Sequence, residues 1–286
     1  MLPIVFWIAA RLLQRQLLDP LFSLRGAAGA IAAGDLDQAI ANTNRIDEIG
    51  QLAKSFASMR DAVRRTILDL KHTNVSIERF VPQAFLSIVG KPSVADVELG
   101  DNKRRTMTVL FSDIRGFTTL SEQMSPDEIF AFINTYLERM GSVIRDHHGF
   151  IDKYIGDAIM ALFANADDAL QAGLAMMATL EGFNAERRAA GREPIGIGIG
   201  INTGSLMLGT IGEKHRMDGT VISDAVNLAA RIEGLTKDYG VPMLISEYTF
   251  EELADPGAYA IRPIDVVVVK GKTRPVAIHA VNPPPA

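Results

Sequence analysis

Short apolar runs alternate with longer stretches of helical periodicity from Thr106 to the C-terminal end, and this alternation limits the fold more than any other feature. Because strands and helices are mixed along this part of the chain, the expected fold class is α/β or α+β. The pattern predicts strands at residues 107–112, 150–155, 158–163, 195–202, 243–245, 264–269 and 275–281, and helices at 126–147, 167–189 and 222–239.

The composition is that of a folded protein long enough for about two domains. Of its 286 residues 48% are apolar, and 29 basic against 34 acidic side chains give a net charge of −5. This acidic balance argues against nucleic acid as a partner. The chain has no cysteine, which excludes disulfides, thiolate metal sites and a cysteine nucleophile, so any metal must be bound by oxygen or imidazole.

Residues 1–19 contain an apolar run, residues 2–10, that is too short to cross a bilayer alone, since a spanning helix needs about 20 apolar residues. Arg11, Arg15 and Arg25 follow, with no acid before Asp19, as at the cytoplasmic end of a membrane helix. We therefore expect the end of a truncated transmembrane helix, which implies an inner-membrane location. The alternative is an amphipathic leader on a membrane or a partner.

Residues 20–70 contain two short stretches of heptad spacing joined by a polar connector. Two such helices must run parallel and need partners to cover their apolar seams. The spacing, the initial Pro20 and the run Asp47-Glu48-Ile49-Gly50 together resemble a HAMP signalling domain. A coiled coil without a signalling role is the alternative. The two seams are Leu21, Leu24, Ala28 and Ile31, and then Ile49, Leu52, Phe56, Met59 and Val63.

The heptad spacing is interrupted after the second seam. The steps around Val63, Ile67 and Leu70 form a four-residue stutter, which locally relaxes a supercoil. The stutter is either a place where upstream rotation becomes downstream motion or an ordinary irregularity. Residues 71–105 then contain Pro82 and Pro92, which predicts an ordered signal-transducing connector after the helix.

Two aspartates stand at the ends of predicted apolar strands. Asp113 lies in the run FSDIRGFT, residues 111–118, where a glycine turn of a kind that cradles phosphate follows a strand. Asp157 lies in the Gly156-Asp157 turn of a predicted hairpin. Taken alone, each aspartate could be merely a helix cap or a turn residue, with no functional role. Together they form an oxygen-only site suited to Mg²⁺ or Mn²⁺.

Two further segments carry polar side chains in suggestive places. Asn227 and Arg231 are four residues apart, so they share one face of the predicted helix 222–239. Lys270 and Lys272 lie between the last two predicted strands. Taken alone, an exposed Asn–Arg pair or hairpin lysines are usually just solvated.

All four segments, in this order, closely resemble the catalytic domain of class III adenylate and guanylate cyclases over residues 106–282. The resemblance implies a ferredoxin-like βαββαβ fold that works as a head-to-tail homodimer, here with a cytoplasmic catalytic domain. It also implies two Mg²⁺ or Mn²⁺ ions per active site, bound by Asp113, Asp157 and the backbone of Ile114. Asn227 would orient the ribose and Arg231 would stabilise the reacting phosphate, both reaching in from the other protomer.

The same resemblance assigns the remaining contacts to nucleotide. Lys270 would contact the triphosphate, and Arg216 is a weaker candidate for a phosphate contact. The phosphate-loop positions are Ile114, Arg115, Gly116, Phe117 and Thr118.

Purine choice is read in this family at two positions, here Lys153 and Thr220. A lysine can donate to adenine N1, which is an acceptor, whereas guanine N1 carries a proton and would need a carboxylate. Gly219 stands where an aromatic residue is frequent, and Ser223 where glycine is frequent. The expected function is therefore conversion of ATP to cyclic AMP and pyrophosphate under HAMP control. The alternatives are a guanylate cyclase and a catalytically silent nucleotide-binding or dimerisation module.

Overall fold

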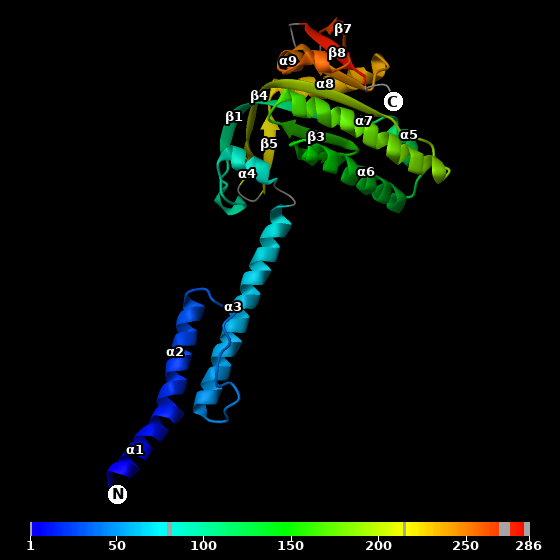
Figure 1. The fold of residues 1–286 in the computed structure, drawn as a ribbon. Helices are drawn as coiled ribbons and strands as arrows, with labels where there is room; N and C mark the ends of the chain where they lie inside the picture. The colour runs from blue at the N-terminus through cyan, green and yellow to red at the C-terminus, as the bar shows by residue number, and fades with distance from the viewer. Residues whose placement is uncertain (1, 79–81, 214–215, 269–274, 283–286) are drawn as a thin grey trace. The chain divides into compact units, whose positions relative to one another are not determined.

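The structure is a computed structural model that describes residues 2–78, 82–213, 216–268 and 275–282. The chain divides into two compact units, Met1–Phe80 and Val81–Ala286. Figure 1 shows the elements of both units by their labels. The first unit is helical, and the second contains an eight-stranded sheet.

The first unit begins with three helical segments that follow one another directly: α1 (Leu2–Leu13), a π-helical turn η1 (Gln14–Leu18) and α2 (Asp19–Ala32). Pro20 explains the wide turn, because proline has no N–H to donate to the carbonyl of Gln16 and its ring crowds that carbonyl. After the connector, α3 (Glu48–Glu78) is one 31-residue helix that runs through the predicted stutter without a break.

The packing between α2 and α3 follows the predicted seams in part. Leu24, Ala27, Ile49 and Ala53 are buried together with Ile40 of the connector. Leu24 and Ile49 belong to the predicted seams, whereas Ala27 and Ala53 are one residue away from the predicted Ala28 and Leu52.

The start of α3 is connected to the middle of η1 by Arg45. Its guanidinium donates to the carbonyl of Gln16 at 3.1 Å and forms a bidentate ion pair with Asp47. Asp47 in turn caps α3, since its carboxylate accepts from the N–H of Gly50 at 3.0 Å. A Cβ at Gly50 would lie 2.1 Å from the carbonyl oxygen of Arg45, so only glycine fits there.

The structure corrects the predicted membrane location. Across the stretches that the structure describes, no helix is long and apolar enough to cross a membrane. The reason is length, because the apolar part of α1 is about half of the roughly 20 residues required and Arg11 and Arg15 follow within two turns. The inner-membrane location predicted from this segment is therefore wrong.

The second unit is built around one sheet with strand order β2-β3-β1-β4-β6-β8-β7, in which β5 also pairs with β4. The neighbours are antiparallel except β4 and β6. The strands are β1 (Asn102–Ile114), β2 (Phe150–Ile155), β3 (Ala158–Phe163), β4 (Ile197–Glu213), β5 (Arg216–Ile222), β6 (Met243–Ser246), β7 (Ile261–Val267) and β8 (Val276–Val281). The first half, β2-β3-β1-β4, has the ferredoxin-like order, which confirms the predicted fold class.

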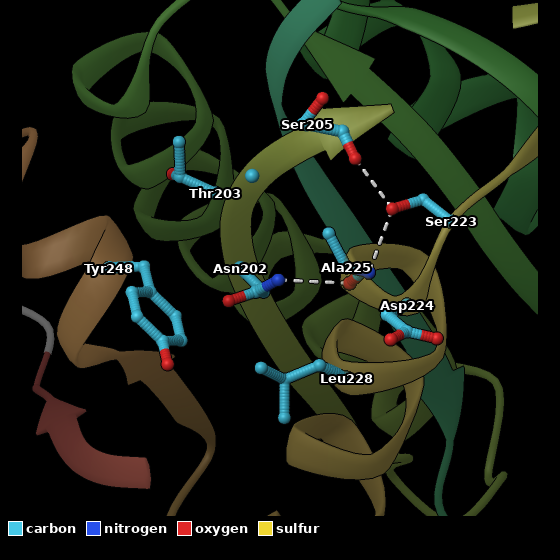
Figure 2. Close-up of a pocket in the computed structure, with 9 residues that line it drawn as sticks. Asn202, Thr203, Ser205, Ser223, Asp224, Ala225, Leu228 and Tyr248 are labelled. Atoms are coloured by element: carbon cyan, nitrogen blue, oxygen red, sulfur yellow. Dashed lines mark hydrogen bonds between the residues drawn. The ribbon is translucent and has the colours of Figure 1, made fainter. Parts of the chain in front are cut away.

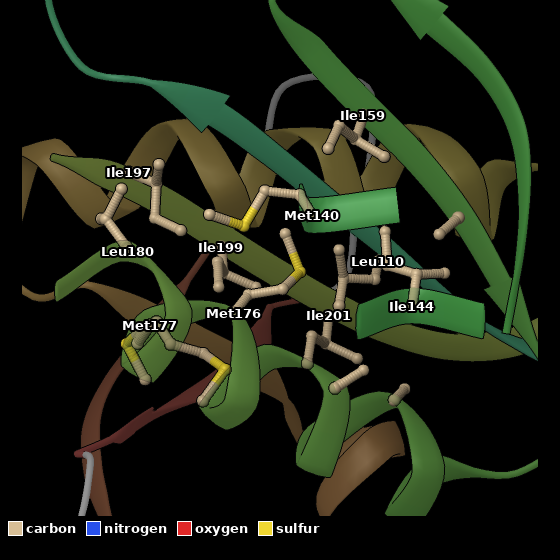
Figure 3. Packing of buried hydrophobic residues seen from close by; sticks show 14 of the residues in the cluster. Leu110, Met140, Ile144, Ile159, Met176, Met177, Leu180, Ile197, Ile199 and Ile201 are labelled. Carbon is tan, nitrogen blue, oxygen red and sulfur yellow. The ribbon is translucent and has the colours of Figure 1, made fainter. Parts of the chain in front are cut away.

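The helices α6 (Pro126–Asp146) and α7 (Ala166–Ala189) cover one face of this sheet. Figure 3 shows the contact, in which Met140 and Ile144 of α6 and Met176 of α7 meet Leu110 and the isoleucines of β4. α6 begins with a complete capping box between Ser125 and Glu128, as its sequence predicts.

The opposite face carries α4 (Gln83–Val89) and α8 (Asp224–Asp238), which pack on Val109, Phe111 and Leu208. The remaining short elements are α5 (Phe117–Ser121), α9 (Glu247–Glu251), and the 3₁₀ turns η2 (Val94–Asp96) and η3 (Pro256–Ala258). The main difference from the prediction is β4, which continues to Glu213 and pairs with β5, a strand that the sequence pattern did not indicate.

Candidate active site

The two predicted metal-binding aspartates lie side by side. Asp113 is the last but one residue of β1, and Asp157 lies in the turn between β2 and β3. The backbone N–H of Ile114 lies 3.0 Å from Asp113 Oδ1 and 3.3 Å from Asp157 Oδ2, so it donates to both carboxylates. Pairing of β1 with β3 brings the strand end and the hairpin turn together.

The electrostatics of this pair favour a cation. Burial and the neighbouring carboxylate of Asp157 raise the pKa of Asp113 to about 7, and the charge of Glu233 adds to the effect. A divalent ion would remove this repulsion, and carboxylate oxygens with a backbone carbonyl are ligands that Mg²⁺ and Mn²⁺ accept. Among the described residues no group of three or more acidic, histidine or cysteine side chains could hold a metal, so this two-carboxylate set is the arrangement to consider.

The two purine-reading candidates also contact each other. Lys153 of β2 donates from Nζ to Thr220 Oγ1 of β5 at 2.8 Å. The pairing of β2 with β3 shifts register between Ile151 and Lys153, which makes Asp152 the extra residue of a bulge, and bulges re-aim neighbouring side chains. The buried carboxylate of Asp152 lies 3.4 Å from Lys153 Nζ, and burial raises its pKa despite that cation.

Asn227 and Arg231 lie on α8, away from the side that packs on the sheet. Leu228, Ala229 and Ile232 of α8 are buried, whereas Asn227 is exposed and Arg231 partly exposed. Asn227 and Arg231 therefore lie on one helix, as predicted, and both are accessible from outside the domain.

The helix α8 rests on a strip of β4 that has almost no side chains. A Cβ at Gly200 would lie 2.2 Å from the backbone nitrogen of Glu233, and one at Gly198 would lie 2.3 Å from the Glu233 carboxylate. Asn202, on the same face of β4, donates to the carbonyl of Ala225 at 2.9 Å. Alternating glycines thus let the helix approach the strand backbone directly.

A cavity of about 250 Å³ opens beside the first turn of α8. Figure 2 shows Ser223 at its edge, where the hydroxyl donates to the carbonyl of Ser205 and accepts from the N–H of Ala225. Ser223 is thus the N-cap of α8. Glycine, which has no side chain, could not make these two hydrogen bonds.

Arg115 lies in the turn after β1, and its side chain contacts the protein backbone. Its guanidinium donates to the backbone carbonyls of Thr236 and Val241, at 3.2 and 2.6 Å, and so fixes the C-terminal end of α8 to the turn after β1. Glu233, which the sequence reading missed, is half-buried within range of the charges of Arg115 and Asp157, and its partial burial raises its pKa. The alternating glycines of β4 were the available signal for such a close helix.

The remaining predicted contacts lie in the turn after β1, at the start of β5 or outside the described residues. Gly116 has a positive φ of 68° and precedes α5, which contains Phe117 and Thr118. Arg216 is the first residue of β5 and is exposed. Lys270 lies outside the residues that the structure describes.

Sequence comparisons point to one family for the second unit. Residues 100–282 match the family model of the adenylate and guanylate cyclase catalytic domain, and residues 12–65 match that of the HAMP domain. An adenylate cyclase of Anabaena cylindrica is 46% identical over 96% of this chain and 56% of that protein. A terminal-differentiation-specific adenylate cyclase of Dictyostelium discoideum is 40% identical over 72% of this chain and 10% of that protein. The chain thus spans about half or less of these relatives.

Solved structures agree with this result. The adenylyl cyclase CyaB of P. aeruginosa is 34% identical, with a TM-score of 0.59 over 64% of this chain and 97% of that one. The guanylyl cyclase Cya2 is 35% identical, with a TM-score of 0.55 over 64% of this chain and 94% of that one. With a fold, a motif set and a family match that agree, the chain belongs to the adenylate and guanylate cyclase catalytic domain family, with a HAMP domain before the catalytic domain.

Proposed function

We propose that this chain is an adenylate cyclase that converts ATP to 3′,5′-cyclic AMP and pyrophosphate. The observation that carries the choice of ATP is the hydrogen bond between Lys153 and Thr220. Because similar solved structures include both an adenylyl and a guanylyl cyclase at nearly equal identity, the family alone does not select the purine. A lysine ammonium can donate to adenine N1 but not to the protonated N1 of guanine.

Asp113, Asp157 and the backbone carbonyl of Ile114 would hold two Mg²⁺ or Mn²⁺ ions. When bound, such ions lower the pKa of the ribose 3′-hydroxyl and neutralise phosphate charge. The 3′-oxygen then attacks the α-phosphorus, the bond from that phosphorus to the bridging oxygen breaks, and pyrophosphate leaves while the hydroxyl proton passes to solvent. The adjacency of two carboxylates with a raised Asp113 pKa supports this assignment.

The active site is shared between two protomers in this proposal. Asn227 would orient the ribose and Arg231 would stabilise the reacting phosphate across the interface, and their open position on α8 supports such a role. Lys270, Arg216 and the Gly116–Thr118 turn would contact phosphates. The first unit also offers a surface for pairing, since apolar side chains follow one another along α3: Leu52, Met59, Val63, Ile67 and Leu70.

The HAMP segment, residues 20–70 in our division, would pass a signal through the connector 71–105 to the catalytic domain 106–282. The exposed seam on α3 supports a parallel homodimer, because an apolar stripe of this length is normally covered by a second helix.

Product formation tests the proposal directly. The full chain is incubated with ATP or GTP and Mn²⁺ or Mg²⁺ across a dilution series, and cyclic products are separated. We expect cyclic AMP to dominate and specific activity to fall on dilution. Cyclic GMP as the main product would reject the purine assignment, and no cyclic product from folded, dimeric protein would favour the silent signalling module.

Complementation tests the shared site. Asp113→Ala and Asn227→Ala chains should each be inactive, and their mixture should recover part of the activity, because one of the two sites in a heterodimer keeps every group. A mixture of Asp113→Ala with Asp157→Ala is the matched control. Both aspartates belong to the metal-binding half of a site, so each of the two sites in this heterodimer carries one defect and neither is complete. Equal activity in both mixtures, with heterodimers shown to form, would contradict a two-chain site.

A further inference from the structure

Phe85 of α4 lies directly against the strand that carries Thr220. A Cβ built on Gly219 would have three nearest neighbours, at 3.1, 3.2 and 3.4 Å, and all are the distal ring atoms Cζ, Cε1 and Cε2 of Phe85. The ring is only 3% exposed and belongs to the core on this face of the sheet. The Phe85 ring thus occupies the space into which a side chain at position 219 would extend.

The connector is fastened to the same strand pair by a second set of contacts. The Thr210 hydroxyl donates to the carbonyl of Glu98 at 2.6 Å, and the N–H of Thr210 donates to the carbonyl of Asp101 at 2.9 Å. Asp101 forms an ion pair with Lys91 at 2.8 Å, just after α4. In the ladder of β4 with β5, Thr210 is the register partner of Gly219.

The Phe85 ring and the Thr220 hydroxyl lie on opposite faces of β5. Successive residues of a strand face opposite sides, so Gly219 presents its α-carbon to the ring while Thr220 presents its hydroxyl to Lys153. A shift of α4 toward or away from the sheet therefore changes the support under β5 at the residue next to Thr220. Asp113 and Asp157 are not among the atoms nearest to this contact.

We propose that Phe85 is a positioning residue for purine selection: its ring supports β5 at Gly219 and so sets the place of Thr220 relative to Lys153. The proposal rests on the proposed function, because it takes Lys153 and Thr220 as the groups that meet the purine. In this proposal the position of α4 affects nucleotide affinity and purine preference, whereas metal affinity does not depend on it.

Phe85→Leu in the full chain tests this assignment, since leucine keeps most of the buried apolar volume but lacks the three ring atoms next to Gly219. Dissociation constants are measured for the α,β-methylene analogues of ATP and GTP, which bind without turnover, and Mn²⁺ affinity is measured alongside. We expect ATP-analogue affinity to fall about tenfold, GTP-analogue affinity to fall less, and Mn²⁺ affinity to stay within about twofold.

The matched control is Leu86→Val, which changes the neighbouring α4 residue, 2% exposed and in the same core cluster. It should leave the ratio of the two nucleotide affinities unchanged. In the double variant Phe85→Leu/Gly219→Ala the added methyl fills part of the gap, so we expect more of the wild-type ratio to return than in Phe85→Leu alone. Gly219→Ala by itself crowds the ring and should also change the ratio, which keeps the test available if Phe85→Leu does not fold.

An unchanged affinity ratio in folded Phe85→Leu and Gly219→Ala chains would overturn the positioning role. Equal changes in Phe85→Leu and Leu86→Val would also overturn it, because they would indicate general loosening of α4. Failure of the proposed function is recognised separately, as absence of cyclic AMP from the wild-type chain in the product assay, whereas the binding ratio is measured without turnover.

Discussion

Lys153 and Thr220 are joined by a hydrogen bond of 2.8 Å between side chains that are 67 positions apart in the sequence. The preceding residue, Asp152, has its carboxylate 3.4 Å from the same Nζ. The ammonium group is thus held by a buried carboxylate and a hydroxyl, which restricts its rotamers. A donor fixed in this way is suited to discriminate between two bases.

Lys153→Glu should reverse the purine preference. A carboxylate cannot donate to adenine N1 but can accept from guanine N1, so kcat/KM for ATP should fall by about 100-fold or more and the share of cyclic GMP should rise. Lys103→Glu makes the same charge change at an exposed residue of β1 and should leave the product ratio as it is. An unchanged product ratio in Lys153→Glu would show that the purine is read elsewhere.

Metal affinity should depend on pH through Asp113. Its pKa is raised to about 7, so a proton competes with the metal below neutrality, and Mn²⁺ affinity should rise by about tenfold between about pH 6 and about pH 8. Titration calorimetry with Mn²⁺ measures this. In Asp157→Asn the like charge is absent, so the rise should move to lower pH. A flat profile in the wild-type chain would contradict the raised pKa.

Asp113→Asn should stabilise the metal-free catalytic unit while it abolishes metal binding. The folded-state pKa of Asp113 lies above its unfolded value of about 4, so its contribution to stability is present at low pH and is lost as pH rises through about 7. The variant should therefore melt about 2 °C higher at pH 8 in chelator, with the difference disappearing near pH 4. Calorimetric melting of Asp238→Asn, at the exposed end of α8, is the control and should show no such pH-dependent gain.

Arg45→Ala should loosen the junction between η1 and α3. It removes the donor to the carbonyl of Gln16 and the partner of Asp47, so amide exchange at residues 16–24 and 47–51 should accelerate by about tenfold or more. Hydrogen exchange by mass spectrometry resolves both segments. Arg64→Ala, which breaks an exposed pair with Asp37, should leave these rates unchanged. Equal acceleration in both variants would mean that Arg45 contributes only surface charge.

The hairpin and the long helices could be predicted because their signals are local. Residues 150–155 and 158–163 carry strand patterns on either side of a Gly-Asp turn, and both strands have these bounds in the structure. The fold class followed from the same alternation. The adjacency of Asp113 and Asp157 was also expected, since both stand at strand ends.

Other features depend on contacts that no local pattern contains. The extension of β4 contains Gly209 and Gly212, and β5 contains Gly219, so neither has a clear strand pattern in the sequence. The ladder between them is stabilised by the connector bound at Thr210. Arg115 was placed with the phosphate loop because of its motif, whereas the contacts of its side chain with the carbonyls of Thr236 in α8 and of Val241 after it are set by tertiary packing. The inner-membrane location was wrong because no helix of the described residues is long and apolar enough to cross a membrane.

The bare strip of β4 beneath α8 has a mechanical consequence. Where interlocking side chains separate a helix from a sheet, rotamer changes can absorb small displacements. At Gly200 the backbone of β4 meets the backbone of α8 directly, so no side chain there can absorb a displacement. The helix is therefore held rigidly on the sheet, by Arg115 near its C-terminal end and by Asn202 near its N-terminal end. In the shared site that we propose, Asn227 and Arg231 can then approach the partner's aspartates only by movement of whole domains, so catalysis is governed by the angle between two rigid bodies.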